Sequence, residues 1–379
     1  MRSIVRPLVA VSLLAGLTAA PQAVAAPVEF SFAGRGFGHG VGMSQYGAYG
    51  AALAGWGEAR IIRHYYPGTT LGRTTPAQRR VRVLLQERRL RTSMVATRAV
   101  LARPATGPAL ALPAGPLRVT READRAVITD RMGRAHALAM PVRLISRAPL
   151  AVGGIRYRGA VEVHPESTRR VDVVNDVPLE GYLRGVVPRE VPASWARRAA
   201  AAVRAQAIVA RSYAVSSRRQ GAHFELHADT RSQVYGGLDA EDPRAGAAVA
   251  ATAGRVVQRE GAVVTTYFFS TSGGRTESAA VVWGVPAVHL VSRPDPFDRV
   301  SPYHRWPEPV RIRGDALAEG LGLDAAVTDI RVLERARSPR VVRVRITTAD
   351  GATATVSGAR LQAAAGLRST WFSVRRSRP

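Results

Sequence analysis

The stretch Val174-Asn-Asp-Val-Pro-Leu-Glu-Gly-Tyr-Leu-Arg-Gly-Val-Val-Pro-Arg-Glu-Val-Pro-Ala-Ser-Trp195 decides the expected fold, because it joins two helical patterns through a short loop bounded by prolines. Glu190 is the one carboxylate between Pro188 and Pro192. We expect Pro188 to end the first helix, which places Glu190 in a rigid loop at the mouth of the second. Such a loop can hold a functional acid, but a solvated glutamate that offsets Arg189 would give the same pattern.

Two helices are expected on either side of this loop. Asp176 can cap the first, and Pro178 suits its first turn. Ser194 can cap the second, which should run from Trp195 to about Ser217. A stripe of small residues on the second helix, three or four positions apart, can bring another backbone close, and its members are Val203, Ala207, Ala210 and Ala214.

The remaining chain predicts short strands separated by Pro, Gly and Asp turns. They are expected at 81–85, 117–120, 126–129, 142–145, 161–163 and 341–346, the last before an Asp-Gly hairpin turn. The pattern predicts an α+β fold in which antiparallel sheet dominates and the central helical pair, with Glu190 between its helices, packs on one side.

Charge and composition restrict the partners. The formal net charge is +26, from 54 basic and 28 acidic residues, and every basic residue is arginine. An excess of this size favours a polyanion. Nucleic acid is not expected, because the arginines are scattered and are not interleaved with aromatic residues. With no cysteine, the chain has no disulfide framework, lipoprotein anchor or thiolate metal site.

The first 25 residues have the pattern of a secretory signal peptide. Arg2 and Arg6 precede the apolar run 8–20, and Ala23-Val-Ala25 supplies a cleavage site of small residues. The run is too short to span a bilayer, and no second run of spanning length follows. We therefore expect a protein that is secreted to the cell wall and has no transmembrane segment.

A glycine-rich segment, Gly34-Arg-Gly-Phe-Gly-His-Gly-Val-Gly-Met-Ser-Gln-Tyr-Gly47, has glycine at every second position up to residue 42. If it is extended, one face is bare backbone and the other carries side chains that include His39. A bare face lets a partner backbone or a sugar ring approach closely. The segment is not a phosphate-binding loop, since it lacks the required Gly-Lys-Ser/Thr.

The stretch 174–195, together with Ala205-Gln-Ala-Ile-Val-Ala-Arg-Ser-Tyr-Ala214, resembles the signature of the stage II sporulation protein D family, which also includes the amidase enhancers. Further motifs follow in the family's order over about residues 165–375. They are Asp229-Thr-Arg-Ser-Gln-Val-Tyr235, Thr252-Ala-Gly-Arg-Val-Val257, Phe269-Ser-Thr-Ser-Gly-Gly-Arg-Thr-Glu-Ser278, Trp283 and Leu367-Arg-Ser-Thr-Trp-Phe372. The glycine-rich segment and Tyr65-Tyr-Pro-Gly-Thr69 also resemble a family motif, which commonly lies nearer the C-terminal part of the domain.

The resemblance implies a peptidoglycan lytic transglycosylase with Glu190 as its general acid and base, acting on glycan strands that have lost their stem peptides. It also implies a substrate site built from residues of the matching motifs, which are Arg211, Gln233, Tyr235, Ser270, Ser272 and Glu277, with His39 added from the glycine-rich segment. Each has a structural alternative: Arg211 can pair with a carboxylate, Tyr235 can be core, and Ser272 can lie in a tight turn. His39 can be a packed, hydrogen-bonded histidine.

The expected segments are a signal peptide (1–25), the glycine-rich segment (26–73), a β-rich accessory region (74–165), the catalytic core (166–309) and a C-terminal β region that completes the core (310–379). The partners would be glycan strands, anionic wall polymers and a cell-wall amidase.

No metal or cofactor is expected. His223 and His227 have no third ligand at a suitable spacing, and the His-Cys zinc pair of some family members is replaced here by Arg231 and Ser232. Three other functions stay open at this point. The first is a non-catalytic amidase enhancer. The second is a hydrolase that pairs Glu190 with Asp229 or Glu277. The third, a serine hydrolase, lacks the Gly-x-Ser-x-Gly motif.

Overall fold

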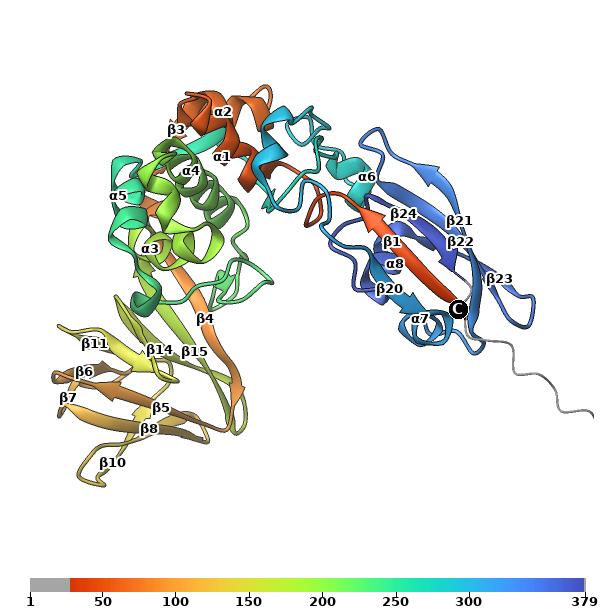
Figure 1. Ribbon diagram of the computed structural model, residues 1–379. Helices are drawn as coiled ribbons and strands as arrows, with labels where there is room; N and C mark the ends of the chain where they lie inside the picture. Colours follow the sequence, from red (N-terminus) through yellow and green to blue (C-terminus); the bar gives the residue numbers. More distant parts are fainter. Residues whose placement is uncertain (1–27, 378–379) are drawn as a thin grey trace, which may run out of the picture.

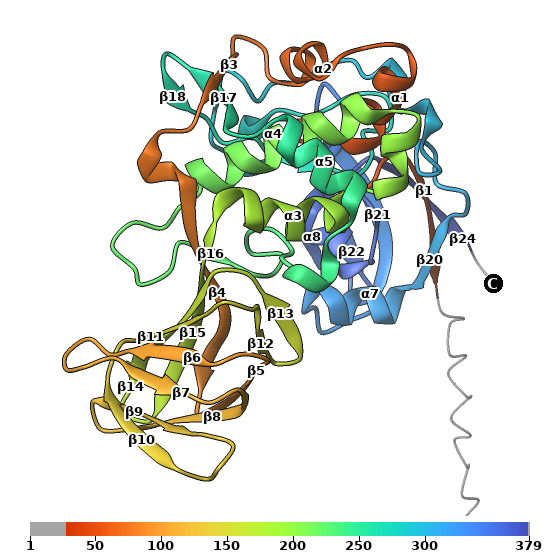
Figure 2. The same ribbon diagram turned by 90° about the vertical axis from the view of Figure 1, so that its left-hand side faces the viewer.

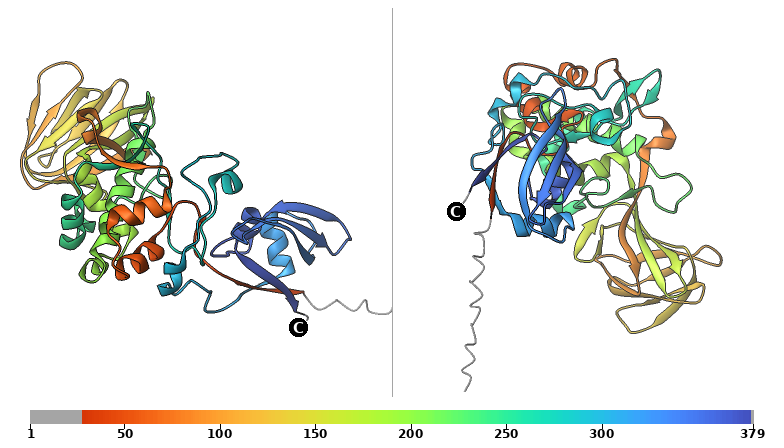
Figure 3. Two further views of the ribbon diagram at one scale, coloured as in Figure 1. Left: turned by 90° about the horizontal axis from the view of Figure 1, so that it is seen from above. Right: turned by 90° about the vertical axis from the view of Figure 1, so that its right-hand side faces the viewer.

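The computed structural model describes residues 28–377, which form three parts in an elongated arrangement (Figure 1). A helical part lies between a β-rich part and a C-terminal lobe, and the view from above shows the same order (Figure 3). The predicted α+β class is confirmed. The signal-peptide prediction lies outside the described residues. Within residues 28–377, no helix has the length and apolar character needed to cross a membrane.

The helical part carries most of the helices and small pieces of sheet (Figure 2). Its α-helices are α1 (Gln45–Leu53), α2 (Glu58–Tyr65), α3 (Leu179–Glu190), α4 (Ala200–Ser216), α5 (Pro243–Ala251) and α6 (Ala279–Trp283). Its 3-10 helices are η2 (Ala193–Arg197), η3 (Leu238–Ala240) and η4 (Pro296–Val300). One sheet joins β3 (Thr70–Arg73), β17 (Arg255–Arg259) and β18 (Ala262–Val263), and β2 (Met43–Ser44) pairs in parallel with β19 (Phe268–Phe269).

The predicted boundaries of the helical pair are partly wrong. Asp176 does not cap α3: it lies within strand β15 (Arg170–Pro178) and pairs with Arg80 and Arg143, and Pro178 is the N-cap. Pro188 does not end α3. A proline in the last turn removes one hydrogen bond but keeps a helical φ, and the N–H of Val191 still donates to Val187. Glu190 is therefore the last residue of the helix.

The second helix also starts later than predicted. Ser194 lies within η2, and α4 follows from Ala200 with Ala199 as its N-cap. The stripe of small residues predicted on α4 is confirmed, since all four side chains are buried in one core with α3 and α5. Close packing along this stripe holds α3, and with it Glu190, in a fixed position.

The β-rich part contains two sheets, which are antiparallel except where the short strand β16 pairs in parallel with β4. The six-stranded sheet has the order β10 (Ala135–Ala139), β9 (Arg125–Thr129), β8 (Gly115–Glu122), β5 (Arg91–Ala96), β12 (Leu150–Val152) and β13 (Ile155–Tyr157). The seven-stranded sheet has the order β16 (Leu226–His227), β4 (Arg80–Arg89), β15, β14 (Ala160–Ser167), β11 (Val142–Ser146), β6 (Val100–Arg103) and β7 (Leu110–Leu112). The 3-10 helix η1 (Pro76–Arg79) leads into β4. A boundary at residue 165 would cut the β14–β15 hairpin, so the accessory region is continuous with the core through β15.

The C-terminal lobe has its own apolar core and does not complete the core around α4. Its sheets are β20 (Val310–Arg313), β1 (Glu29–Gly34) and β24 (Phe372–Ser377), and β21 (Val327–Arg335), β22 (Val341–Thr348) and β23 (Thr353–Ser357). Helices α7 (Gly314–Leu321) and α8 (Gly358–Ala364) complete it. Strand β1 lies among strands from the far end of the chain (Figure 1), and Phe30 and Phe32 are buried there.

The glycine-rich segment connects β1 to α1 and is not a regular strand. Gly36, Gly38, Gly40 and Gly42 all have φ between 77° and 103°, a left-handed region that side chains disfavour. The close approach predicted for this segment occurs against the backbone of residues 267–272: a Cβ on Gly36 would lie 2.9 Å from the Thr271 carbonyl oxygen. Phe37 and Thr271 exchange backbone hydrogen bonds of 2.8 and 3.1 Å.

Replacing Gly42 with alanine tests this close approach. A Cβ there would lie 2.0 Å from the Tyr267 carbonyl oxygen, in addition to the left-handed strain. We expect Gly42→Ala to lower the free energy of unfolding by about 3 kcal/mol or more. The matched control is Gly55→Ala, whose φ is 83° but which has no neighbour within 4 Å, and we expect it to cost about 1 kcal/mol. Equal losses in denaturant unfolding would contradict the close approach.

Candidate active site

Glu190 lies in a pocket of about 350 Å³. Segments far apart in the sequence build it, and the lining residues are His39, Glu190, Tyr213, Thr230, Ser232, Gln233, Val234, Tyr267, Phe268 and Trp283. Among the lining residues within 28–377, Glu190 is the only one that has a carboxyl group. The pocket therefore presents one acid to a ligand.

Burial raises the pKa of Glu190 to about 6, because the charged form loses water. The Gln45 side chain and the Val234 backbone hydrogen-bond to the carboxylate and oppose this rise. Val191 and Trp195, which follow Glu190 closely in the chain, are themselves buried. Arg189 is exposed and is not among the groups that shift this pKa.

Gln45 is a site residue that the sequence reasoning missed. It is the first residue of α1, whose N-cap Ser44 accepts a 3.0 Å hydrogen bond from the Gly47 backbone N–H. The cap fixes the helix start and so fixes Gln45 beside Glu190. The available signal was its place within the glycine-rich segment, three residues after Gly42.

His39 lines the pocket, and both of its ring nitrogens are already engaged. Nε2 donates to the Phe268 carbonyl oxygen at 3.1 Å, and Nδ1 accepts from the Val41 backbone N–H at 3.0 Å. Burial lowers the pKa of His39 to about 4, so the ring is neutral near pH 7. His39 therefore shapes the pocket wall and is not available for proton transfer.

Aromatic side chains form one wall of the pocket. Trp283 is 41% exposed, and its ring centroid lies 4.5 Å from that of Tyr267 and 5.2 Å from that of His39. Tyr213, from α4, lies 5.8 Å from Tyr267. These rings offer flat apolar faces with polar edges next to the acid. Trp283 was noted as part of a motif, but its place at the site could not be read from the sequence.

Of the seven residues predicted to bind substrate, two line the pocket: His39 and Gln233. Gln233 is 2% exposed, and its Oε1 accepts from the Tyr182 hydroxyl at 3.3 Å. Its Nε2 has no partner among the described residues. A buried amide with a spare donor can be satisfied by a ligand.

Arg211 and Tyr235 are not pocket residues, and the structural alternative holds for both. The Arg211 side chain is 0% exposed and pairs with Glu180 through bonds of 3.0 and 2.6 Å, which ties α4 to α3. Tyr235 is buried in the core, where its hydroxyl donates to Asn175 at 3.0 Å. Both stabilise the scaffold under Glu190.

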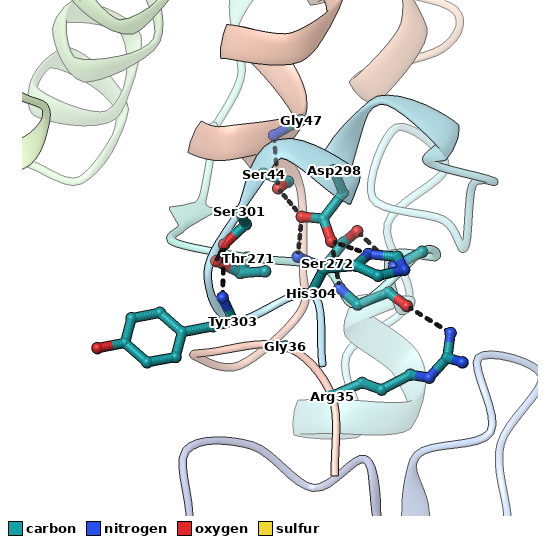
Figure 4. Close-up of polar contacts among 12 residues, drawn as sticks. Arg35, Gly36, Ser44, Gly47, Thr271, Ser272, Asp298, Ser301, Tyr303 and His304 are labelled. Carbon is teal, nitrogen blue, oxygen red and sulfur yellow. Dashed lines mark hydrogen bonds and ion pairs between the residues drawn. The ribbon is translucent and has the colours of Figure 1, made fainter. Parts of the chain in front are cut away.

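Ser270, Ser272 and Glu277 also lie outside the pocket. Ser272 is buried in a turn whose backbone N–H groups, at Ser272 and Gly273, donate to Asp298 at 2.8 and 2.9 Å (Figure 4). The Ser270 carbonyl accepts from Tyr46 at the start of α1. The buried Glu277 accepts from Ser278 N–H at 2.7 Å and from the Ser338 hydroxyl. These residues hold the glycine-rich segment in place. The role of Asp298 was not predicted from the sequence.

No group of three or more metal-ligating side chains occurs within the described range 28–377. The two histidines considered as ligands do not share a helical face. His223 bonds to Asp172 at 2.8 Å, and His227 lies in the short strand β16. Asp229 pairs with Arg231, which holds its pKa down at about 2.

Comparison with known proteins finds one family model and several relatives that match the central part of the chain. The family model described as stage II sporulation protein matches residues 167–258, which include α3, Glu190 and α4. Amidase enhancer of Bacillus subtilis (strain 168) is 34% identical over 116 residues, which are 31% of this chain and 15% of the relative. Stage II sporulation protein D of the same strain is 29% identical over 178 residues, 42% of this chain and 51% of the relative.

An uncharacterized protein of Brachyspira hyodysenteriae is 33% identical over 142 residues, 37% of this chain and 38% of the relative. The chain thus spans between about one seventh and one half of the lengths of these relatives. The match over residues 167–258 and these relatives support the resemblance to the family of stage II sporulation protein D and the amidase enhancers that the motifs indicated.

The raised pKa of Glu190 predicts a pH-dependent stability. The folded protein holds this proton more tightly than the unfolded chain. Proton binding by Glu190 therefore stabilises the folded protein below pH 4.5, and this stabilisation is lost as the pH rises through about 6. The amide of Glu190→Gln has no charge to bury at either pH. The free energy of unfolding of the variant minus that of wild type should therefore be higher at pH 7.5 than at pH 4, by about 2 kcal/mol. Denaturant unfolding at both pH values measures the difference. A pH-independent difference would contradict the burial of this acid.

Proposed function

We propose that this protein is an exported peptidoglycan lytic transglycosylase. Its substrate would be the MurNAc-GlcNAc glycan strand, free of stem peptides, and its products would end in 1,6-anhydro-muramyl groups. The observation that carries the proposal is the lone carboxyl of Glu190, with its raised pKa, in a pocket that has an aromatic wall.

A single acid suffices for this chemistry. Glu190 is protonated in an appreciable fraction of molecules near pH 6 and donates its proton to the glycosidic oxygen as the bond to the anomeric carbon breaks. The C6 hydroxyl of the same muramic acid attacks that carbon, and the Glu190 carboxylate takes the hydroxyl proton. The acid is regenerated, and no water is consumed.

Hydrolysis with two carboxylates has less support. A second carboxylate would have to face the same sugar across the cleaved bond. Asp229 is exposed and held by Arg231, and Glu277 is buried against Ser338 and Ser278. Neither lines the Glu190 pocket.

The other pocket residues suit a carbohydrate. Trp283 offers a half-exposed ring on which a sugar can stack, and the free Nε2 of Gln233 can donate to a sugar oxygen. Gln45 and the Val234 N–H stabilise the carboxylate form that must exist after proton donation. The proposed location is the cell wall, where the arginine excess would also favour anionic polymers.

A second candidate, a non-catalytic amidase enhancer, is favoured by one observation, the 34% identity to a protein of that name. In that function the protein would bind glycan and stimulate a cell-wall amidase without cutting the strand. The two candidates differ in whether the purified protein alone creates new strand ends.

Glu190→Gln should lower turnover of denuded glycan strands by about 10²–10⁴-fold or more, because the amide keeps the shape of the acid but has no proton to donate. Strand binding should change little. Glu87→Gln, at an exposed glutamate paired with Arg231, is the matched control and should keep wild-type turnover. Wild-type turnover by purified Glu190→Gln would remove Glu190 from the mechanism.

A further inference from the structure

Two adjoining pockets lie outside the Glu190 pocket, where the glycine-rich segment meets the C-terminal lobe. Their volumes are about 500 and 490 Å³, and both are lined by Arg35, Pro339 and Trp371. We call them together the arginine pockets, after their six arginines, which are Arg35, Arg275, Arg299, Arg305, Arg335 and Arg337. The proposed function assigns no role to this surface.

These arginines differ from many others in the protein. Within residues 28–377, none of the six forms an ion pair with an acidic side chain, whereas elsewhere Arg80 and Arg143 share Asp176, and Arg158 pairs with Glu241. An unpaired arginine is ordinary on a surface, but six arginines around two neighbouring pockets concentrate positive charge there. Such a site attracts anions.

The positive charges also act on one another. Burial and the nearby charge of Arg305 lower the pKa of Arg35, although a guanidinium stays charged at any physiological pH. The two groups therefore repel each other when nothing lies between them. An anion bound there would relieve that repulsion.

Some of the guanidinium groups are held in position. Arg335 donates to the Pro339 carbonyl at 2.8 Å and to the Phe372 carbonyl at 3.0 Å. The Arg35 guanidinium lies 5.7 Å from the ring centre of Trp371. Preorganised guanidinium groups lose less freedom when they bind an oxyanion.

One acid, Asp295, also lines the arginine pockets, and it does not neutralise them. It is fully buried, and burial together with neighbouring Asp298 raises its pKa to about 7. At neutral pH it carries only part of a charge against six arginines. Asp298 is occupied by His304 and by the turn at Ser272, which Figure 4 shows beside Arg35.

We propose that the arginine pockets bind an extended anionic carbohydrate polymer that carries carboxylate or phosphate groups. Guanidinium groups recognise both kinds of oxyanion, and arginines that line two neighbouring pockets suit a chain with repeated anionic groups. Concave pockets favour a single chain over a flat membrane surface. Trp371 lines both pockets and offers an apolar surface for a sugar ring.

The arginine pockets lie close to the Glu190 pocket. Arg35 and His39 are four residues apart in the glycine-rich segment, so their Cα atoms are at most about 14 Å apart. A polymer bound at the arginine pockets would lie beside the strand bound at Glu190. The choice of a wall polymer rests on the proposed function, whereas the anionic preference rests on the arginines.

The test replaces Arg299, Arg305 and Arg337 together with glutamine, since all three are exposed and their side chains make no hydrogen bond or ion pair within the described residues. The matched control replaces Arg98, Arg118 and Arg134, which are exposed arginines of the β-rich part, and changes the net charge equally. Both sets carry Glu190→Gln, so that strands stay intact. Thermal unfolding midpoints that match the parent confirm that each variant is folded.

Binding is measured by titration with three probes, which are denuded glycan strands, a phosphodiester-linked wall polysaccharide and a neutral chitin oligosaccharide. We expect the pocket variant to lose about tenfold or more in affinity for at least one anionic probe, with a weaker salt dependence, and the control variant to lose less than about threefold. Loss for the glycan strands alone identifies lactyl carboxylates as the ligand groups. Loss for the polysaccharide alone identifies phosphate, and loss for both supports a site for either oxyanion.

Equal losses in the two variants, or no loss in the pocket variant, would overturn the proposal. A loss for the neutral probe as large as for the anionic probes would also overturn it. Failure of the transglycosylase proposal is seen separately, as unchanged turnover when Glu190→Gln is the only substitution.

Discussion

The site depends on the contact between the glycine-rich segment and a second segment far away in the sequence. Residues 36–42 run against the backbone of 267–272 so closely that Gly42 has no room for a Cβ. Asp298 fixes the far side of this contact by accepting from Ser44 and from the turn at Ser272. The contact places Gln45 against Glu190 and brings Phe268 and Tyr267 to the same pocket.

The glycine-rich segment also connects the C-terminal lobe to the helical part. The segment enters from β1, which is a strand of the C-terminal lobe, and leaves into α1, which packs on α4. One short stretch therefore connects the lobe, the arginine pockets and the Glu190 pocket. A family motif that lies early in this chain can build the site because sheet and turn contacts do not depend on the order of segments in the sequence.

The sequence predicted the parts of the structure that depend on local pattern. The alternation in Val341-Val-Arg-Val-Arg-Ile346 became β22, and the small-residue stripe of α4 is buried, because periodicity reports directly which face is covered. Pro188 was misjudged because a proline in a last helical turn costs little. The site was predicted only in part: Gln233 and His39 line the pocket, but Arg211 forms an ion pair with Glu180 outside it. Gln45 and Asp298 were missed, because long-range polar contacts leave no local signal.

If Glu190 is the only acid and base, the sugar itself must supply the nucleophile. Mass spectrometry of denuded glycan strands digested by the wild-type protein in isotopically labelled water tests this directly. We expect anhydro-muramyl ends that lack one water and carry no label. Reducing ends that contain labelled oxygen would contradict this expectation by showing hydrolysis with a second carboxylate. The absence of any new ends would contradict it in favour of a non-catalytic enhancer.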